Sequence, residues 1–122
     1  MILKKCLTIL VTVMPLVVHA AIGSGWTDET RSTMISGCVD SITKSMIATY
    51  RQQAGLSESD PLPENVQQGV QREIIPELRK TCTCTIDRII EKHTYQEVED
   101  DLSILKRAGA SIGSPNGCPL NL

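Results

Sequence analysis

The segment Leu78–Ile89, LRKTCTCTIDRI, decides the fold of this chain. Its apolar residues recur at helical spacing and predict an amphipathic helix whose buried face carries Leu78, Cys82, Ile86 and Ile89. Residues two apart on a helix point about 200° away from each other, so the thiols of Cys82 and Cys84 face opposite sides. We therefore expect each of these cysteines to bond to a partner elsewhere in the chain.

Cys38 and Cys118 are the available partners. Cys38 lies on the apolar stripe of an earlier predicted helix, so a Cys38–Cys82 bond would clamp two helices through the core. The C-terminal segment carries Cys118 and can return it to Cys84 on the other side of the helix. We favour these two pairs. The crossed pairing, Cys38 with Cys84 and Cys82 with Cys118, is the main alternative, because the sequence alone allows three connectivities.

Cys82 and Cys84 also have a functional interpretation, as a thiol-redox pair or as metal ligands. Redox pairs usually have two intervening residues at a helix N-terminus, whereas Thr83 alone separates this pair in mid-helix. His93 is the only histidine after the first twenty residues, and it lies well along the helix from the pair. A zinc site of four thiolates is typical of a reducing compartment. We therefore expect structural disulfides, with no metal and no cofactor.

The first helix is expected directly after the unique tryptophan. Thr27 is a good N-cap, and the helix should end near Ala54, where Gly55 can adopt the left-handed conformation that satisfies the last carbonyl groups. Its apolar stripe consists of Ile35, Cys38, Val39, Ile42, Met46 and Tyr50. Residues 56–63 are rich in serine and proline and are expected to form a linker.

The second helix is expected to run from about Glu64 to His93. Pro76 lies inside it and should kink it or divide it into two helices joined end to end. Thr94 and Glu97 then have the spacing of a capping box, which predicts that a third helix starts at Tyr95 and ends at Gly109. The apolar face expected for this third helix carries Tyr95, Val98, Leu102 and Leu105.

The pattern as a whole predicts an all-α domain of three helices, or four if Pro76 divides the second. The segment from about residue 110 to the end is rich in glycine and proline and is expected to be an irregular tail. One tryptophan, two tyrosines and no phenylalanine leave a core of aliphatic side chains. Such a core is modest in a domain of this size, and disulfides would offset the shortfall.

The first twenty residues have the layout of a cleavable secretory signal. A positive start, Met1–Lys5, is followed by an apolar stretch from Cys6 to Val18, and Val18 and Ala20 occupy the two positions that usually flank a cleavage site, here after Ala20. The apolar stretch falls short of the ~20 residues that span a bilayer. We expect a mature single domain, residues 21–122, with no stable membrane anchor, located in the bacterial periplasm or secreted.

The net charge of the chain argues against polyanionic partners. The full chain carries a net charge of −2, and loss of Lys4 and Lys5 with the signal leaves ten basic and fourteen acidic residues, a net charge of −4. The mature sequence contains no basic cluster that would compensate for this deficit. We therefore expect no nucleic acid and no anionic membrane surface as the main partner.

Several other residues have both a structural and a functional interpretation. His93 has no nucleophile placed beside it by a motif, so a partly buried histidine that interacts with the terminal helix carbonyls is favoured over a catalytic one. Trp26 is expected to pack over the helix ends rather than anchor a partner.

Ile47 and Ile104 lie off the apolar stripes, where they would mark a partner surface if exposed. Favourable charge at a helix N-terminus accounts for the acidic cluster Glu97, Glu99, Asp100 and Asp101.

The order of Trp26, a helix with Cys38, and Cys82-Thr83-Cys84 in a later helix resembles that of small exported bacterial proteins, whose functions are mostly unknown. The resemblance covers Trp26 to about Leu105. It implies a small helical fold and carries over no activity. Periplasmic immunity and inhibitor proteins are similar in general build.

We expect a non-catalytic protein-binding module of inhibitor, immunity or adaptor type. This expectation rests on export, on small size, on two disulfides and on the lack of a catalytic constellation. Its partner would be another protein or a second copy of the chain. The alternative is a thiol-redox or metal-handling protein that uses Cys82 and Cys84, and thiol titration of the native protein distinguishes the two. A small hydrolase that uses His93 is a third interpretation, which needs more than a lone histidine.

Overall fold

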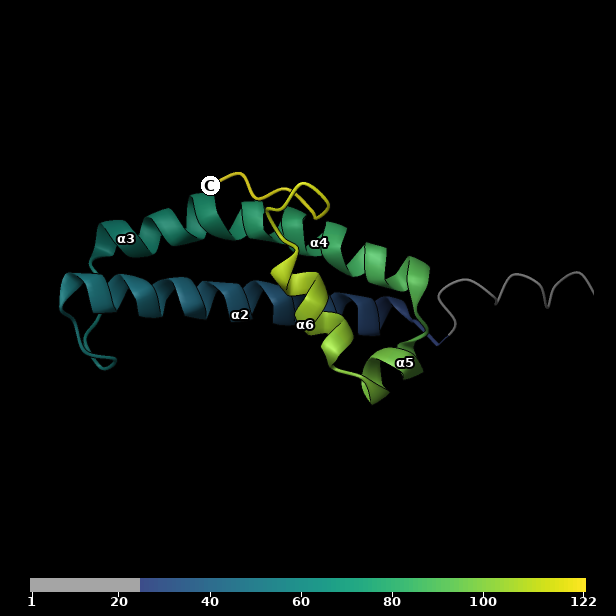
Figure 1. The fold of residues 1–122 in the computed structure, drawn as a ribbon. Coiled ribbons are helices and arrows are strands. Elements are labelled where there is room, and N and C mark those ends of the chain that lie inside the picture. Colours follow the sequence, from purple (N-terminus) through teal and green to yellow (C-terminus); the bar gives the residue numbers. More distant parts are fainter. Residues whose placement is uncertain (1–24) are drawn as a thin grey trace, which may run out of the picture.

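The computed structural model describes residues 25–122, and this part of the chain is all-helical, with no strand. The segment expected to be a signal, residues 1–20, lies outside the described residues. Within residues 25–122, no helix combines the length and the apolar character that crossing a membrane requires. Figure 1 shows one long helix lying beside a second helical run, with shorter helices near one end.

The first long helix, α2, spans Asp28–Ala54, in agreement with the ends predicted from Thr27 and Gly55. The side chain of Thr27 accepts a hydrogen bond from the backbone N–H of Thr30, and the Thr30 hydroxyl in turn accepts one from the backbone N–H of Thr27. At the other end, Gly55 has φ = 72°, and its N–H closes the last turn on carbonyls of α2. Both ends of α2 are therefore set by local sequence.

The second helical run consists of α3, Glu64–Gly69, the π-helix η2, Val70–Ile74, and α4, Ile75–Lys92. The α-helical run is interrupted, as expected, but by the π-helix at Val70–Ile74 and not at Pro76, which is the second residue of α4. Proline has no N–H to donate four residues back. Immediately before it, the Ile75 N–H donates to the carbonyl of Val70, a π-type bond one residue longer than that of an α-helix.

The core lies where α2 and α4 run antiparallel side by side (Figure 1). All four predicted residues of the α4 stripe are buried, and Leu78 and Cys82 have no exposed surface. From α2, Ile35 and Val39 are buried as well. Full burial of an aliphatic side chain of this kind contributes about 1.5–3 kcal/mol. The buried cluster consists of Ile35, Val39, Leu78, Cys82, Ile86, Ile89, Val98 and Ile104.

The expected third helix is in fact two helices, α5, Tyr95–Asp100, and α6, Ser103–Ala110. Asp101 ends α5 in an extended conformation, with φ = −137° and ψ = 90°. Its side-chain Oδ1 accepts a hydrogen bond from the backbone N–H of Ser103 at 3.0 Å. An aspartate that bonds to the backbone two residues on offers the chain an alternative to helix, which is why the run breaks here.

This break overturns two side-chain predictions. Leu102, placed on the buried face by helical spacing, is 68% exposed. Ile104, placed off the apolar stripe, is 8% exposed and belongs to the core. A single helical periodicity does not carry across Asp101, because the direction of the chain changes there.

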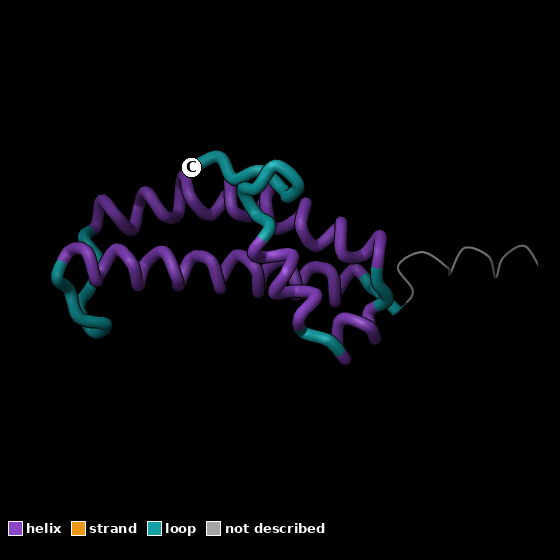
Figure 2. Tube along the Cα trace, viewed as in Figure 1, coloured by secondary structure: helices purple, strands orange, loops and turns teal. Residues whose placement is uncertain are grey.

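The tail, residues 111–122, has no regular structure, as expected, but it is fastened to α4 (Figure 2). Cys118 is 2% exposed. The Thr81 hydroxyl donates to the carbonyl of Pro119 at 2.7 Å, and Arg88 Nη1 donates to the carbonyl of Asn116 at 3.0 Å. The tail thus forms part of the folded domain.

Gly117 is required by the way the tail folds back. A Cβ at this position would overlap the backbone carbonyl of Ser111, so Gly117→Ala should displace the tail and lower the free energy of unfolding by about 1–3 kcal/mol. A Cβ at Gly109 meets nothing within 4 Å, so Gly109→Ala is the matched control and should be neutral or slightly stabilising. Thermal unfolding of the two variants tests this, and equal melting temperatures would contradict the close approach.

Candidate functional site

The four cysteines of the described residues form two disulfides. Cys38 bonds to Cys82 with a Cα–Cα distance of 5.9 Å, and Cys84 bonds to Cys118 with a Cα–Cα distance of 6.0 Å. These are the pairs favoured by the helical geometry, and the crossed pairs are absent from residues 25–122. Two disulfides in a domain of this size fit an oxidising, extracellular type of environment.

The Cys82-Thr83-Cys84 triplet thus contributes to both staples rather than to one dithiol. Cys82 has no exposed surface and is joined to α2, whereas Cys84 is joined to the tail. Over residues 25–122, no three His, Cys, Asp or Glu side chains come together in a way that would hold a metal ion.

Trp26 packs over the end of α4, which was the structural interpretation of this residue. Its indole Nε1 donates to the carbonyl of His93 at 2.9 Å. Its ring meets that of Tyr95 edge to face, with the centroids 5.2 Å apart. Aromatic pairs in this geometry contribute beyond the area they bury. Trp26 therefore ties the start of α2 to the junction between α4 and α5.

The side chain of His93 contacts Glu97, which corrects two expectations. His93 Nδ1 lies 3.0 Å from a Glu97 carboxylate oxygen, so the ring contacts α5 rather than the terminal carbonyls of α4. Thr94 does accept a hydrogen bond from the Glu97 N–H, but the Glu97 side chain is engaged by His93 instead of closing the capping box. The hydrogen bond from His93 lowers the pKa of Glu97 below its ordinary value.

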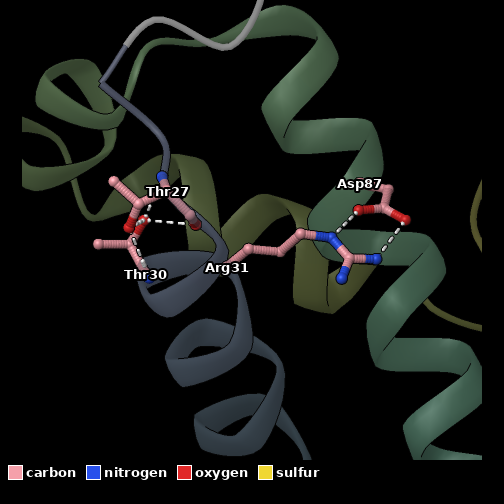
Figure 3. A network of polar contacts seen from close by, with 4 residues as sticks. All are labelled: Thr27, Thr30, Arg31 and Asp87. Carbon is pink, nitrogen blue, oxygen red and sulfur yellow. Dashed lines mark hydrogen bonds and ion pairs between the residues drawn. The ribbon is translucent and has the colours of Figure 1, made fainter.

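An ion pair that the sequence did not indicate joins the two long helices. Arg31 on α2 reaches Asp87 on α4 in a two-pronged contact, with N–O distances of 2.7 and 3.0 Å (Figure 3). The carboxylate raises the pKa of Arg31. The two residues are 56 positions apart, so no local pattern could have linked them. The pair joins the start of α2 to α4, one turn after the Thr27–Thr30 cap.

A groove of about 580 Å³ opens between α2, α4 and the α6 region. Apolar side chains from all three segments lie along it, including Ile42 from α2, Ile89 from α4 and Leu105 from α6. None of its lining residues is charged: Thr33, Met34, Gly37, Cys38, Ser41, Ile42, Ser45, Met46, Thr85, Ile86, Ile89, Leu105, Gly109 and Ile112. We call this feature the α2–α4 groove.

A second apolar hollow, of about 180 Å³, lies between the C-terminal half of α2 and the α3–η2 run. Met46 lines both this hollow and the α2–α4 groove, so the two adjoin at this side chain. Ile47, which lies off the predicted stripe, is half-buried and lines this second hollow. The uncharged surface therefore extends along most of α2.

The α2–α4 groove is assembled from segments about 70 residues apart, Thr33–Met46 and Leu105–Ile112 among them. Each segment has the pattern of an ordinary amphipathic helix by itself, so no local signal in the sequence indicates the groove between them. The position of α6 over α2 and α4, which creates one wall of the groove, follows from the break at Asp101.

Comparisons of this chain with protein-family models, curated proteins and solved structures found no match.

Proposed function

We propose that this chain is an exported, non-catalytic protein-binding module of inhibitor, immunity or adaptor type, whose α2–α4 groove receives the aliphatic side chains of a partner helix. The observation that carries the proposal is the groove itself: about 580 Å³ of surface hollow with no charged side chain in its lining. An apolar groove between helices is a common seat for an amphipathic helix.

The chemistry of the lining supports an aliphatic helical partner. Met34 and Met46 are flexible, polarisable side chains that adapt to irregular apolar surfaces. On the α2 side, Gly37, Ser41 and Ser45 are small and exposed, so a partner backbone can approach closely. The groove and the second hollow adjoin at Met46, and their α2 lining residues run from Thr33 to Tyr50, a length that suits a helix better than a compact ligand.

The Cys38–Cys82 disulfide beside the groove supports binding by a preformed surface. Cys38 lines the groove, and its bond to Cys82 fixes the spacing between α2 and α4. A wall that is already ordered loses little conformational entropy on binding. Export is supported by the two disulfides and by the signal-like pattern of the first twenty residues.

Steric blocking of the groove rim tests the proposal. Ser41→Arg combined with Ser45→Arg places two long charged side chains at the groove without changing a buried residue. Ser32→Arg combined with Ser36→Arg is the matched control: the same change, at the same spacing, on exposed positions of α2 outside the groove. Proteins captured from the exported fraction by the wild type are identified, purified and titrated calorimetrically against all three forms.

We expect the groove variant to bind the purified partner at least about tenfold more weakly, since two charges would be buried in an apolar contact. The control variant should bind like the wild type. Sedimentation of the three forms covers a second copy as partner: self-association must then be lost in the groove variant alone. Capture of no partner and no self-association, or equal binding by all three forms, would count against the proposed function.

A further inference from the structure

A separate pocket of about 450 Å³ lies between the C-terminal half of α4, α6 and the tail. Its lining contrasts with that of the α2–α4 groove because cationic side chains gather in it. The lining residues are Thr85, Arg88, Ile89, Lys92, His93, Ile104, Arg107, Ala108, Ser111, Asn116 and Cys118. We call it the α4–α6 pocket.

Three cations meet at the α4–α6 pocket without an acidic neighbour in its lining. Arg88 and Lys92 come from α4, and Arg107 comes from α6. Over residues 25–122, none of the three lies within 4 Å of a carboxylate oxygen. Asp101, outside the lining, is the acidic group that feels one of them: its pKa is lowered chiefly by its hydrogen bonds with Ser103 and further by the charge of Arg107. The chain as a whole carries a net charge of −2, so this concentration of positive charge runs against the overall balance. Unpaired cations at a concave surface attract anions.

Helix ends explain part of this arrangement, but not all of it. Lys92 and Arg107 lie in the last turns of α4 and α6, where a cation interacts favourably with the helix dipole. That effect does not require the two helix ends and Arg88 to border one hollow. Arg88 is also held in place, because its Nη1 donates to the carbonyl of Asn116 at 3.0 Å, and its other N–H groups remain available.

The apolar part of the lining narrows the class of ligand. Ile89 and Ile104 are 5% and 8% exposed, and Ala108 lies beside them in the lining. An inorganic anion would contact the cations alone, whereas an apolar body could also contact the small parts of Ile89 and Ile104 that reach the lining and the half-buried Ala108. We propose that the α4–α6 pocket binds a small organic anion, with its carboxylate or phosphate held by Arg88, Lys92 and Arg107 and its apolar body against Ile89, Ile104 and Ala108. This inference does not depend on the proposed function, because the three cations that would hold the anion line the α4–α6 pocket and not the α2–α4 groove.

Calorimetric titration of the mature chain with octyl phosphate and octanoate tests the proposal, with inorganic phosphate and octanol as the matched partial ligands. Lys92→Gln combined with Arg107→Gln removes two of the three cations. Arg79→Gln combined with Lys106→Gln is the control, because it makes the same change in net charge on exposed positions of α4 and α6 outside the pocket. Charge-assisted hydrogen bonds are strong enough that their loss should weaken binding about tenfold or more.

We expect both amphiphilic anions to bind the wild type and the control variant, and to bind the pocket variant at least about tenfold more weakly. Inorganic phosphate and octanol should each bind far more weakly than octyl phosphate. The proposal is overturned if neither amphiphile binds or if either partial ligand binds as tightly as octyl phosphate. An equal loss of affinity in the control variant would overturn it as well.

Amide shift mapping locates the bound anion and does not depend on any variant. Thr85 and Ile89 line both the α4–α6 pocket and the α2–α4 groove, so the diagnostic shifts are those of residues found in one alone. Shifts centred on Arg107 and Ser111 support the proposal. Shifts centred on Ser41 and Ser45 would assign the amphiphile to the groove and overturn the pocket.

Discussion

Replacing Cys38 and Cys82 by alanine should lower the free energy of unfolding by about 4 kcal/mol. The bond closes a loop with a sequence separation of 44 residues, and the chain-entropy model assigns a crosslink of this span about that value. Small domains are stable by only about 5–15 kcal/mol. The melting temperature should therefore fall by roughly 20 °C, measured by circular dichroism at neutral pH without reductant.

The second disulfide provides the comparison for this result. The Cys84–Cys118 bond has a sequence separation of 34 residues, so its effect on the unfolded chain is nearly as large. Its loss, however, frees residues 111–122 in the native state as well, and this regained entropy offsets part of the destabilisation. The Cys84→Ala/Cys118→Ala variant should lose clearly less melting temperature. An equal loss of melting temperature would show that fastening the tail stabilises the domain as much as the Cys38–Cys82 bond between α2 and α4 does.

Leu78→Ala should produce the second large effect, a loss of about 2–5 kcal/mol, because the truncation leaves a cavity at a fully buried position. Leu102→Ala is the matched control. It makes the same chemical change at a residue that is 68% exposed, so its effect should stay within about 0.5 kcal/mol. Urea titrations of both variants measure the difference. A comparable loss for Leu102→Ala would mean that the helix break at Asp101 is misplaced.

Features that depend on neighbouring residues could be predicted from the sequence. The cap at Thr27, the left-handed Gly55 and the interruption of a helical run near Pro76 are local effects, and the structure contains all three, the last as a π-helix at Val70–Ile74. The stripe of α4 was also predictable, because one uninterrupted helix carries it from Leu78 to Ile89.

Features that depend on competition or on distant segments could not. The Thr94–Glu97 spacing indicates a capping box, but Glu97 is drawn to His93 once the chain turns. Helical spacing assigned Leu102 to the core, yet the side chain of Asp101 breaks the helix just before it. A sequence pattern indicates the local preference of each residue. At Glu97 and at Asp101, a competing side-chain hydrogen bond overrides that preference.

The candidate surfaces were the least predictable part of the molecule. The α4–α6 pocket gathers cations from two helices, and in the sequence Arg88 and Arg107 are separated by the end of α4, the short helix α5 and the break at Asp101. No basic cluster is visible in the sequence because the cluster exists only after folding. The same holds for the α2–α4 groove, whose uncharged lining is shared by three segments.

Disulfide mapping of the protein isolated from its natural source is the decisive measurement for the proposal that two disulfides hold a helical domain outside the cytoplasm. Trypsin releases residues 81–88 with Cys82 and Cys84 on one peptide, so electron-transfer fragmentation of the unreduced digest must separate the two partners. We predict an N-terminus at Ala21, no free thiol, and Cys38 joined to Cys82 with Cys84 joined to Cys118. Retained Met1, reduced cysteines or the crossed pairing would contradict the account.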